Sequence, residues 1–138
     1  MLSTAMGTRL RVFVADDDPE MLAFICELLE AHGCVTQAAR DGEELLDQLI
    51  FTLDQPRLRP DVLVLDVRMP RLSGLGVLSA LRKACWQLPV IMITVMKDES
   101  VRAVAKRHGA VGMLKIPFDP DDLVTAVQNA GAIQHLSG

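Results

Sequence analysis

The sequence has few cysteines, no long apolar run and no excess of positive charge. Its cysteines, Cys26, Cys34 and Cys85, form no CxxC pair, which disfavours a metal site or a disulfide scaffold and fits reduced thiols in a cytoplasmic protein. Charged residues interrupt every apolar run before it reaches the ~18–20 residues of a membrane span. Residues 1–8 lack the basic and apolar segments of a secretory signal. We therefore expect a cytoplasmic protein that does not bind membranes.

Charge and length narrow the class further. The 18 acidic residues outnumber the 14 basic ones, for a net charge of −4, so the chain has no broad attraction for nucleic acid or anionic lipid. Half of the 138 residues are hydrophobic, which is enough for a packed core at a length typical of one domain. We predict a single domain over residues 9–132, with flexible termini at 1–8 and 133–138.

Short apolar segments alternate with amphipathic ones five times along the chain. Because the apolar segments show no polar alternation, they predict buried parallel strands covered by helices on both faces, a doubly wound α/β domain. The expected strands are residues 11–15, 34–39, 62–65, 89–94 and 111–116. Helix starts are expected at Asp18-Pro19, at the capping box of residues 41–44, near Gly74, at Asp98 and at Asp119-Pro120. The expected core face of the second helix is Leu45, Leu46, Leu49, Ile50 and Leu53.

Three aspartates fall at the ends of expected strands. Asp16 and Asp17 follow the first strand, and Asp66 ends the third. If these strands are neighbours the carboxylates meet in one crevice, where two unit charges ~4 Å apart repel by about 4 kcal/mol at an effective dielectric constant of 20. A cation relieves that repulsion, and carboxylate oxygens without cysteine or histidine nearby favour Mg²⁺ or Mn²⁺. The alternative is that Asp17 and Asp18 only begin a helix, where acidic groups suit the dipole.

Several motifs in order carry a resemblance to a known family. They are Val14-Ala15-Asp16-Asp17-Asp18-Pro19, Leu65-Asp66-Val67-Arg68-Met69-Pro70-Arg71-Leu72-Ser73-Gly74, Pro89-Val90-Ile91-Met92-Ile93-Thr94, Gly109-Ala110 and Pro117-Phe118. Over residues 10–130 the chain resembles the receiver domain of two-component response regulators, and its C-terminal motif is most similar to the FixJ-like group. The resemblance implies a CheY-like, flavodoxin-like fold with a five-stranded parallel sheet in the order 2-1-3-4-5, flanked by five helices.

The resemblance also implies roles for the acidic cluster. Asp66 would accept a phosphoryl group from a histidine kinase or phosphotransfer protein. Asp17, Asp66 and the main-chain carbonyl of Arg68 would ligate Mg²⁺ directly, and Asp16 would act through a metal-bound water. Thr94 would donate its hydroxyl to a phosphoryl oxygen. Such a domain is a signalling protein and not an enzyme, and it would switch a partner or an output domain.

The sequence departs from the family at two positions. Ile116 stands where the family has a lysine that pairs with the phosphoryl group, and Met113 stands where it has an aromatic switch residue. Strand alternation points Lys115 to the opposite face of the sheet. Two substitutes for the lysine are open: the side chain of Arg68, or a register slip that brings Lys115 inward. We expect weaker phosphorylation or weaker coupling, because a charge-assisted bond worth roughly 1.5–3 kcal/mol is lost.

Three functions compete on this sequence. The first is a phosphorylated receiver that switches a partner, with dimerisation through the fourth helix, fifth strand and fifth helix, and with no direct binding to nucleic acid. The second is a phosphorylation-independent interaction module, which the apolar Ile116 favours. The third is a flavin protein or a Mg²⁺-dependent phosphohydrolase. The third is disfavoured because the turn after the first strand has no glycines and Asp66 does not begin an Asp-x-Asp-x-Thr motif.

Overall fold

A computed structural model describes residues 9–95 and 99–137 of the chain. Its five strands form one parallel sheet in the order β2-β1-β3-β4-β5. The strands are β1 (Arg11–Ala15), β2 (Val35–Ala39), β3 (Val62–Asp66), β4 (Val90–Thr94) and β5 (Gly112–Lys115). The helices are α2 (Pro19–Ala31), α3 (Gly42–Phe51), α4 (Gly74–Lys83), α5 (Glu99–Arg107) and α6 (Pro120–Ser137). The predicted doubly wound fold and strand order are confirmed.

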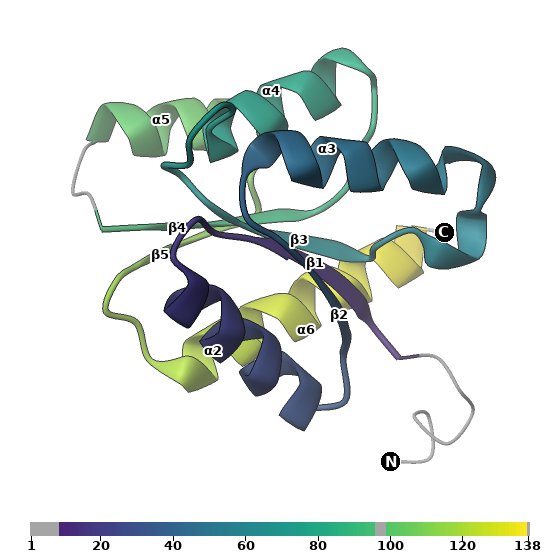
Figure 1. Cartoon of the computed structure of the whole chain (residues 1–138), viewed down its shortest axis with the longest axis horizontal. Coiled ribbons are helices and arrows are strands. Elements are labelled where there is room, and N and C mark those ends of the chain that lie inside the picture. Colours follow the sequence, from purple (N-terminus) through teal and green to yellow (C-terminus); the bar gives the residue numbers. More distant parts are fainter. Residues whose placement is uncertain (1–8, 96–98, 138) are drawn as a thin grey trace.

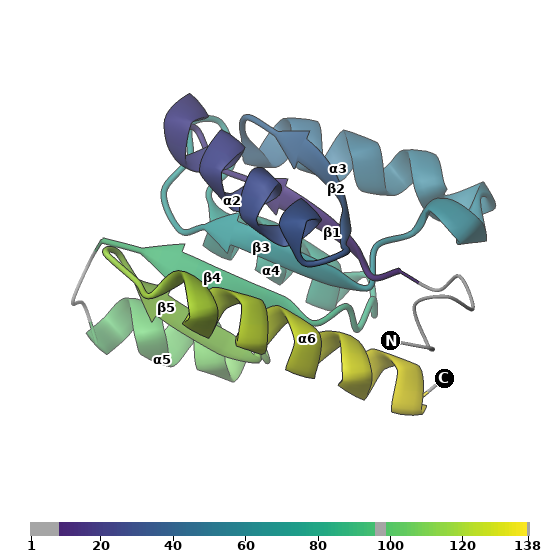
Figure 2. The ribbon, with the colours of Figure 1, turned by 90° about the horizontal axis from the view of Figure 1, so that it is seen from below.

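The helices form two layers around the sheet (Figure 1). Helices α3, α4 and α5 cover one face, and α2 and α6 cover the other; the turned view in Figure 2 shows the same arrangement. Strand residues alternate between the two cores, so that Phe13 and Leu63 pack with the first layer while Val12 and Val64 pack with the second. Both faces are therefore buried, which explains why the strands read as continuous apolar runs. No helix in the described part of the chain is long and apolar enough to cross a membrane.

Short polar side chains start the helices near the carboxyl edge of the sheet. Asp18 accepts a hydrogen bond from the backbone N–H of Glu20 at 3.0 Å, and Asp41 accepts one from Glu44 at 2.8 Å. Ser73 caps α4 by accepting from the backbone N–H of Gly76 at 3.0 Å. Each cap satisfies a donor that the first helical turn leaves without a partner. The predicted helix starts at Asp18 and in the capping box of residues 41–44 are confirmed.

The prediction for the end of α3 was wrong. The helix ends at Phe51 and continues as two short 3₁₀ turns, η1 (Thr52–Asp54) and η2 (Pro56–Leu58). Ile50, inside α3, and Leu53, in η1, are 59% and 53% exposed and do not belong to the core. Where the helix ends, the Thr52 hydroxyl donates to the Leu49 carbonyl at 2.7 Å, a side-chain bond of the kind that competes with continued helix.

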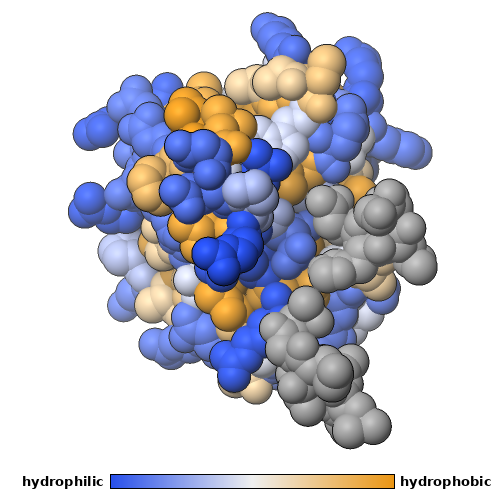
Figure 3. All heavy atoms as spheres, turned by 90° about the vertical axis from the view of Figure 1, so that its right-hand side faces the viewer, coloured by the Kyte–Doolittle hydropathy of each residue, from blue (hydrophilic) through white to orange (hydrophobic). Residues whose placement is uncertain are grey.

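These exposed side chains lie at the end of the sheet away from the aspartates. Ile50 and Leu53 line an apolar groove of about 590 Å³ between α3 and α4, together with Leu81 and Trp86. Figure 3 faces this edge of the molecule and shows apolar surface between hydrophilic side chains.

Helix α6 runs to Ser137, and the predicted domain bounds of 9–132 stay a prediction. A Cβ on Gly131 would lie 2.5 Å from the Leu10 side chain, so the helix is held closely against the residue that precedes β1. Ala130 beside it is buried. Tertiary packing therefore supports the helix at residues 130 and 131. The predictions for residues 1–8 and for a helix start at Asp98 lie outside the described residues.

Candidate functional site

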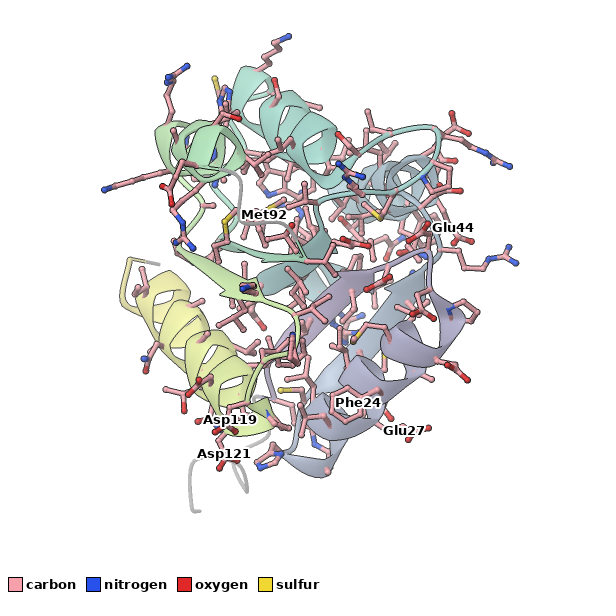
Figure 4. All side chains as sticks on the ribbon, turned by 90° about the vertical axis from the view of Figure 1, so that its left-hand side faces the viewer. Phe24, Glu27, Glu44, Met92, Asp119 and Asp121 are labelled. Atoms are coloured by element: carbon pink, nitrogen blue, oxygen red, sulfur yellow. The ribbon has the colours of Figure 1, made fainter. Side chains whose placement is uncertain are left out.

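The candidate site lies at the carboxyl ends of β1, β3 and β4. Asp16 directly follows β1, Asp66 is the last residue of β3, and Thr94 is the last residue of β4. The register pairs Ala15 with Leu65 and Asp66 with Ile93, so these strand ends are level with one another. Figure 4 looks at this edge of the sheet, with Phe24 on α2 and Asp119 near the start of α6 on the same side.

Carboxylate oxygens from separate segments converge there. One oxygen from each of Asp16, Asp17 and Asp66 lies within 4.8 Å of the other two. They open into a crevice of about 250 Å³. Among the described residues its lining comprises Asp16, Asp17, Asp18, Met21, Asp66, Arg68, Thr94, Val95 and Ile116. The cluster that the sequence predicted is thus assembled by the fold.

Burial and mutual repulsion disturb the ionisation of this cluster. Asp16 is only 2% exposed, and burial raises its pKa. Burial, followed by the negative charge of Asp16, raises the pKa of Asp66 to about 7. The contact between the two side chains adds to the rise in the pKa of Asp66 and opposes the rise in the pKa of Asp16. In the absence of a cation, a bound proton therefore reduces the repulsion between the carboxylates, and a metal ion would have the same effect.

Backbone amides orient the two carboxylates. The backbone N–H of Asp18 donates to Asp16 Oδ1 at 2.9 Å, and that of Arg68 donates to Asp66 Oδ1 at 3.2 Å. Each contact favours the ionised form of its carboxyl group, opposing burial. The carboxylates are therefore fixed in direction before any ligand binds.

The donor set fits a hard divalent cation. It consists of carboxylate oxygens from Asp16, Asp17 and Asp66, and the described residues that line the crevice include neither cysteine nor histidine. Oxygen-only sets suit Mg²⁺ and Mn²⁺ better than zinc or copper. The alternative reading for Asp18 also holds, since this residue caps α2 while it borders the crevice.

A glycine allows α4 to approach the acceptor strand. A Cβ on Gly74 would lie 2.3 Å from the Asp66 carbonyl oxygen and 2.9 Å from the Met92 side chain. The backbone N–H of Gly74 donates to the Val67 carbonyl at 2.9 Å. Only a residue without a side chain fits, as the sequence suggested for this position. The first turn of α4 is thereby held against the backbone of Asp66.

Thr94 and Ile116 form the β4–β5 side of the crevice. Thr94 is 3% exposed, and its carbonyl accepts a hydrogen bond from the backbone N–H of Ile116 at 2.7 Å. The register pairs Thr94 with Lys115, which is exposed, whereas Ile116 lines the crevice and packs with the α2–α6 layer. The register slip considered for Lys115 is therefore not present. The Ile116–Pro117 peptide is cis.

Met113 and Arg68, the two other residues predicted from the sequence to belong to the site, lie in different places. Met113 pairs with Met92 and packs against the core under α3, α4 and α5, on the face opposite to Ile116. Arg68 is exposed and lines the crevice; among the lining residues that the structure describes it carries the positive charge. The side chain of Arg68 thus stays open as a substitute for the family lysine.

Two features of the site had not been identified in the sequence. Met21 of α2, which packs against the core, also lines the crevice. The loop after Asp66 is tied to α3, because Arg71 pairs with Asp41 and Glu43 at 3.7 Å each. These partners are about thirty residues apart in sequence, and no local pattern indicates the contact.

Comparisons with known proteins agree with this geometry. Residues 12–128 match the family model described as response regulator receiver domain. Transcriptional regulatory protein CpxR of Escherichia coli (strain K12) is 36% identical over 118 residues, which cover 86% of this chain and 47% of the relative. Response regulator MprA of Mycobacterium avium (strain 104) is 34% identical over 119 residues, covering 86% and 50%. The chain spans about half the length of these curated relatives.

Solved structures give the same result. The Francisella response regulator 1452 receiver domain superposes with a TM-score of 0.80 at 31% identity, covering 91% of this chain and 98% of that one. FixJ-N superposes with a TM-score of 0.79 at 26% identity, covering 91% and 95%. Membership of the FixJ-like group stays a prediction. The chain belongs to the response regulator receiver domain family of two-component systems, a signalling family and not an enzyme family.

Proposed function

We propose that this domain accepts a phosphoryl group on Asp66 from a histidine kinase or a phosphotransfer protein, and thereby switches a partner or an output domain. The observation that carries the proposal is the position of Asp66 at the end of β3, in an open crevice with Asp16 and Asp17 oxygens within 4.8 Å. A carboxylate held there can be reached by a donor side chain from outside. Such a donor would be made with ATP, and the domain is therefore proposed to act in the cytoplasm.

The transfer is a displacement at phosphorus. An ionised oxygen of Asp66 attacks the phosphorus of a phosphohistidine, a P–O bond forms, and the P–N bond to the imidazole breaks. The imidazole leaves with a proton, and Asp66 becomes a mixed anhydride. Because the pKa of Asp66 is raised to about 7 in the metal-free cluster, the carboxyl group must be ionised before it attacks.

The acidic cluster would hold Mg²⁺ or Mn²⁺ through Asp17, Asp66 and the main-chain carbonyl of Arg68, with Asp16 acting through a bound water. The ion, when bound, supplies charge neutralisation for the phosphoryl oxygens. The backbone N–H of Arg68 keeps Asp66 Oδ1 oriented at 3.2 Å. The Thr94 hydroxyl donates to a phosphoryl oxygen from the next strand end.

The departures at Ile116 and Met113 weaken the switch in this proposal. Without the family lysine, the site keeps one more negative charge at every stage, and a dianionic acyl phosphate adds another. Arg68, exposed at the mouth of the crevice, would supply part of the missing positive charge. Met113 can repack but offers no polar group to couple with Thr94.

A second candidate is an interaction module that works without phosphorylation. The observation that favours it is the apolar lining of the crevice by Ile116, Met21 and Val95. Under either function we expect protein partners, dimerisation through the α5–β5–α6 face, and no direct contact with nucleic acid.

Mass spectrometry after incubation with Mg²⁺ and acetyl phosphate or phosphoramidate tests the proposal. We expect a gain of one phosphoryl group that Asp66→Asn abolishes and Asp54→Asn, a change at an exposed aspartate in η1, retains. A chain that gains no Asp66-dependent mass with either donor, or with a kinase, contradicts the proposal. The second candidate predicts that Asp66→Asn leaves partner binding unchanged, so a large loss of binding in that variant would eliminate it.

A further inference from the structure

Helix α4 is fastened to the acceptor strand at its first turn. The backbone N–H of Gly74 donates to the Val67 carbonyl at 2.9 Å, and the Gly74 backbone lies against the Asp66 carbonyl, where a Cβ would come within 2.3 Å. A change in the backbone at Asp66 or Val67 therefore acts directly on the start of α4. The helix has ten residues, about 15 Å long, and behaves as a rigid rod on that scale.

The last turn of the same helix is fastened to a different part of the fold. Arg82 Nε donates to the His108 carbonyl at 2.7 Å, and Nη2 donates to the Gly109 carbonyl at 3.3 Å. Nη1 donates to the Trp86 carbonyl at 2.8 Å, and Nη2 also donates to the Leu88 carbonyl at 3.0 Å. One side chain thus joins the end of α4 to the turn of residues 108–111, which connects α5 to β5.

The contact is specific to a guanidinium group. Four backbone carbonyls from two loops surround Arg82, and a planar fork of donors can reach them together, whereas a lysine ammonium cannot. The His108 and Gly109 carbonyls lie at the negative end of the α5 dipole. Burial lowers the pKa of Arg82, which agrees with a side chain withdrawn from water. Gly109 adopts a φ of 81° and presents its carbonyl to this group.

We propose that α4 and Arg82 form a second mechanical connection from the acceptor Asp66 to the α5–β5 turn, parallel to the one through Thr94. The proposal rests on the proposed function, since it needs Asp66 to change state. The α4 connection matters in this chain because Met113 and Ile116 replace the residues that the family uses for coupling through β4 and β5. The α4 connection uses neither of them.

Amide chemical shifts test the connection, with beryllofluoride and Mg²⁺ used as the phosphoryl probe on the full ¹⁵N-labelled chain. In the unchanged protein we expect shifts at Val67 and Gly74 and at residues 108–112. Arg82→Met should reduce the response of residues 108–112 by about twofold or more, the range of energetic coupling along such contacts. The response at Thr94 and Val95 should persist. Arg82→Lys should behave as Arg82→Met, and Lys83→Met, a change at the exposed neighbour on the same turn, should have no effect.

The outcomes separate this inference from the proposed function. If Val67 and Gly74 do not respond in the unchanged protein, the proposed function fails and this inference fails with it. If they respond while residues 108–112 do not, or if the turn responds equally in Arg82→Lys, only the inference is overturned. A structural role alone would alter the free protein but would leave the difference between free and beryllofluoride-bound states intact. If Arg82→Met does not fold, the chemical-shift responses of the unchanged protein and of Arg82→Lys still test the inference.

Discussion

The metal-free domain should become less stable as the pH rises from about 4 to about 7, because of Asp66. The pKa of this group rises from 3.8 to about 7 in the folded chain, so the folded state binds more protons than the unfolded state in that interval. Unfolding free energy therefore falls with increasing pH and levels off above pH 8. Three pKa units correspond to about 4 kcal/mol. Solvent screening of this half-buried group leaves about 1–2 kcal/mol.

Asp66→Asn removes the titration while its amide oxygen can still accept from the Arg68 backbone N–H. Urea unfolding in EDTA at pH 5 and pH 8 measures the effect as a difference between the two proteins, which cancels other titrating groups. We expect Asp66→Asn to be more stable by about 1–2 kcal/mol at pH 8 and nearly equal at pH 5. Millimolar Mg²⁺ should stabilise the unchanged chain at pH 8 and leave Asp66→Asn far less affected. A difference that does not vary with pH would refute the repulsion assigned to the cluster.

Three further changes test single contacts. Gly74→Ala should destabilise the domain by about 2 kcal/mol or more and slow phosphoryl transfer, because its Cβ would lie 2.3 Å from the Asp66 carbonyl oxygen. Urea unfolding measures the loss of stability, and the gain in mass over time measures phosphoryl transfer. Gly112→Ala is the control that should be tolerated, because the atom nearest to its Cβ would be 3.7 Å away. Ile116→Lys should raise the affinity for beryllofluoride about tenfold in a calorimetric titration, which is the value of one charge-assisted bond. An unchanged affinity would mean that another positively charged group already neutralises the ligand in the crevice. Ser73→Ala should cost about 1 kcal/mol through the lost helix cap, measured as a shift of the urea midpoint with an unchanged slope.

The sequence predicted the sheet and the acidic cluster for the same reason. Strands such as Val62–Asp66 are apolar on both faces, which requires a parallel sheet covered on both sides. In such a sheet the residues that follow neighbouring strands meet at one edge. Asp16 and Asp66, fifty residues apart, could therefore be expected to meet if their strands are neighbours, and the family resemblance supplied that strand order.

Contacts that depend on side-chain reach between elements could not be predicted. Arg82 has the appearance of an ordinary basic residue in the last turn of a helix, yet its partners at His108 and Gly109 lie more than twenty-five residues away. Ile50 continues the apolar composition of α3, yet its side chain lies on the exposed side of the helix, which only the packing of the helix on the sheet decides. Periodicity identifies a helix, but its end depends on hydrogen bonds that a hydropathy pattern does not contain.

The apolar rim of the crevice bears on how long a phosphorylated state would persist. Hydrolysis of an acyl phosphate needs a water molecule held in line behind the phosphorus, and polar side chains are what hold such a water. Met21, Val95 and Ile116 provide no group of that kind, so that among the described lining residues the task would fall to Arg68, Thr94 and the acidic side chains. Because part of the lining is apolar, we expect the phosphoryl group to be lost slowly, so that the output would follow the average of a stimulus over time and not its momentary level.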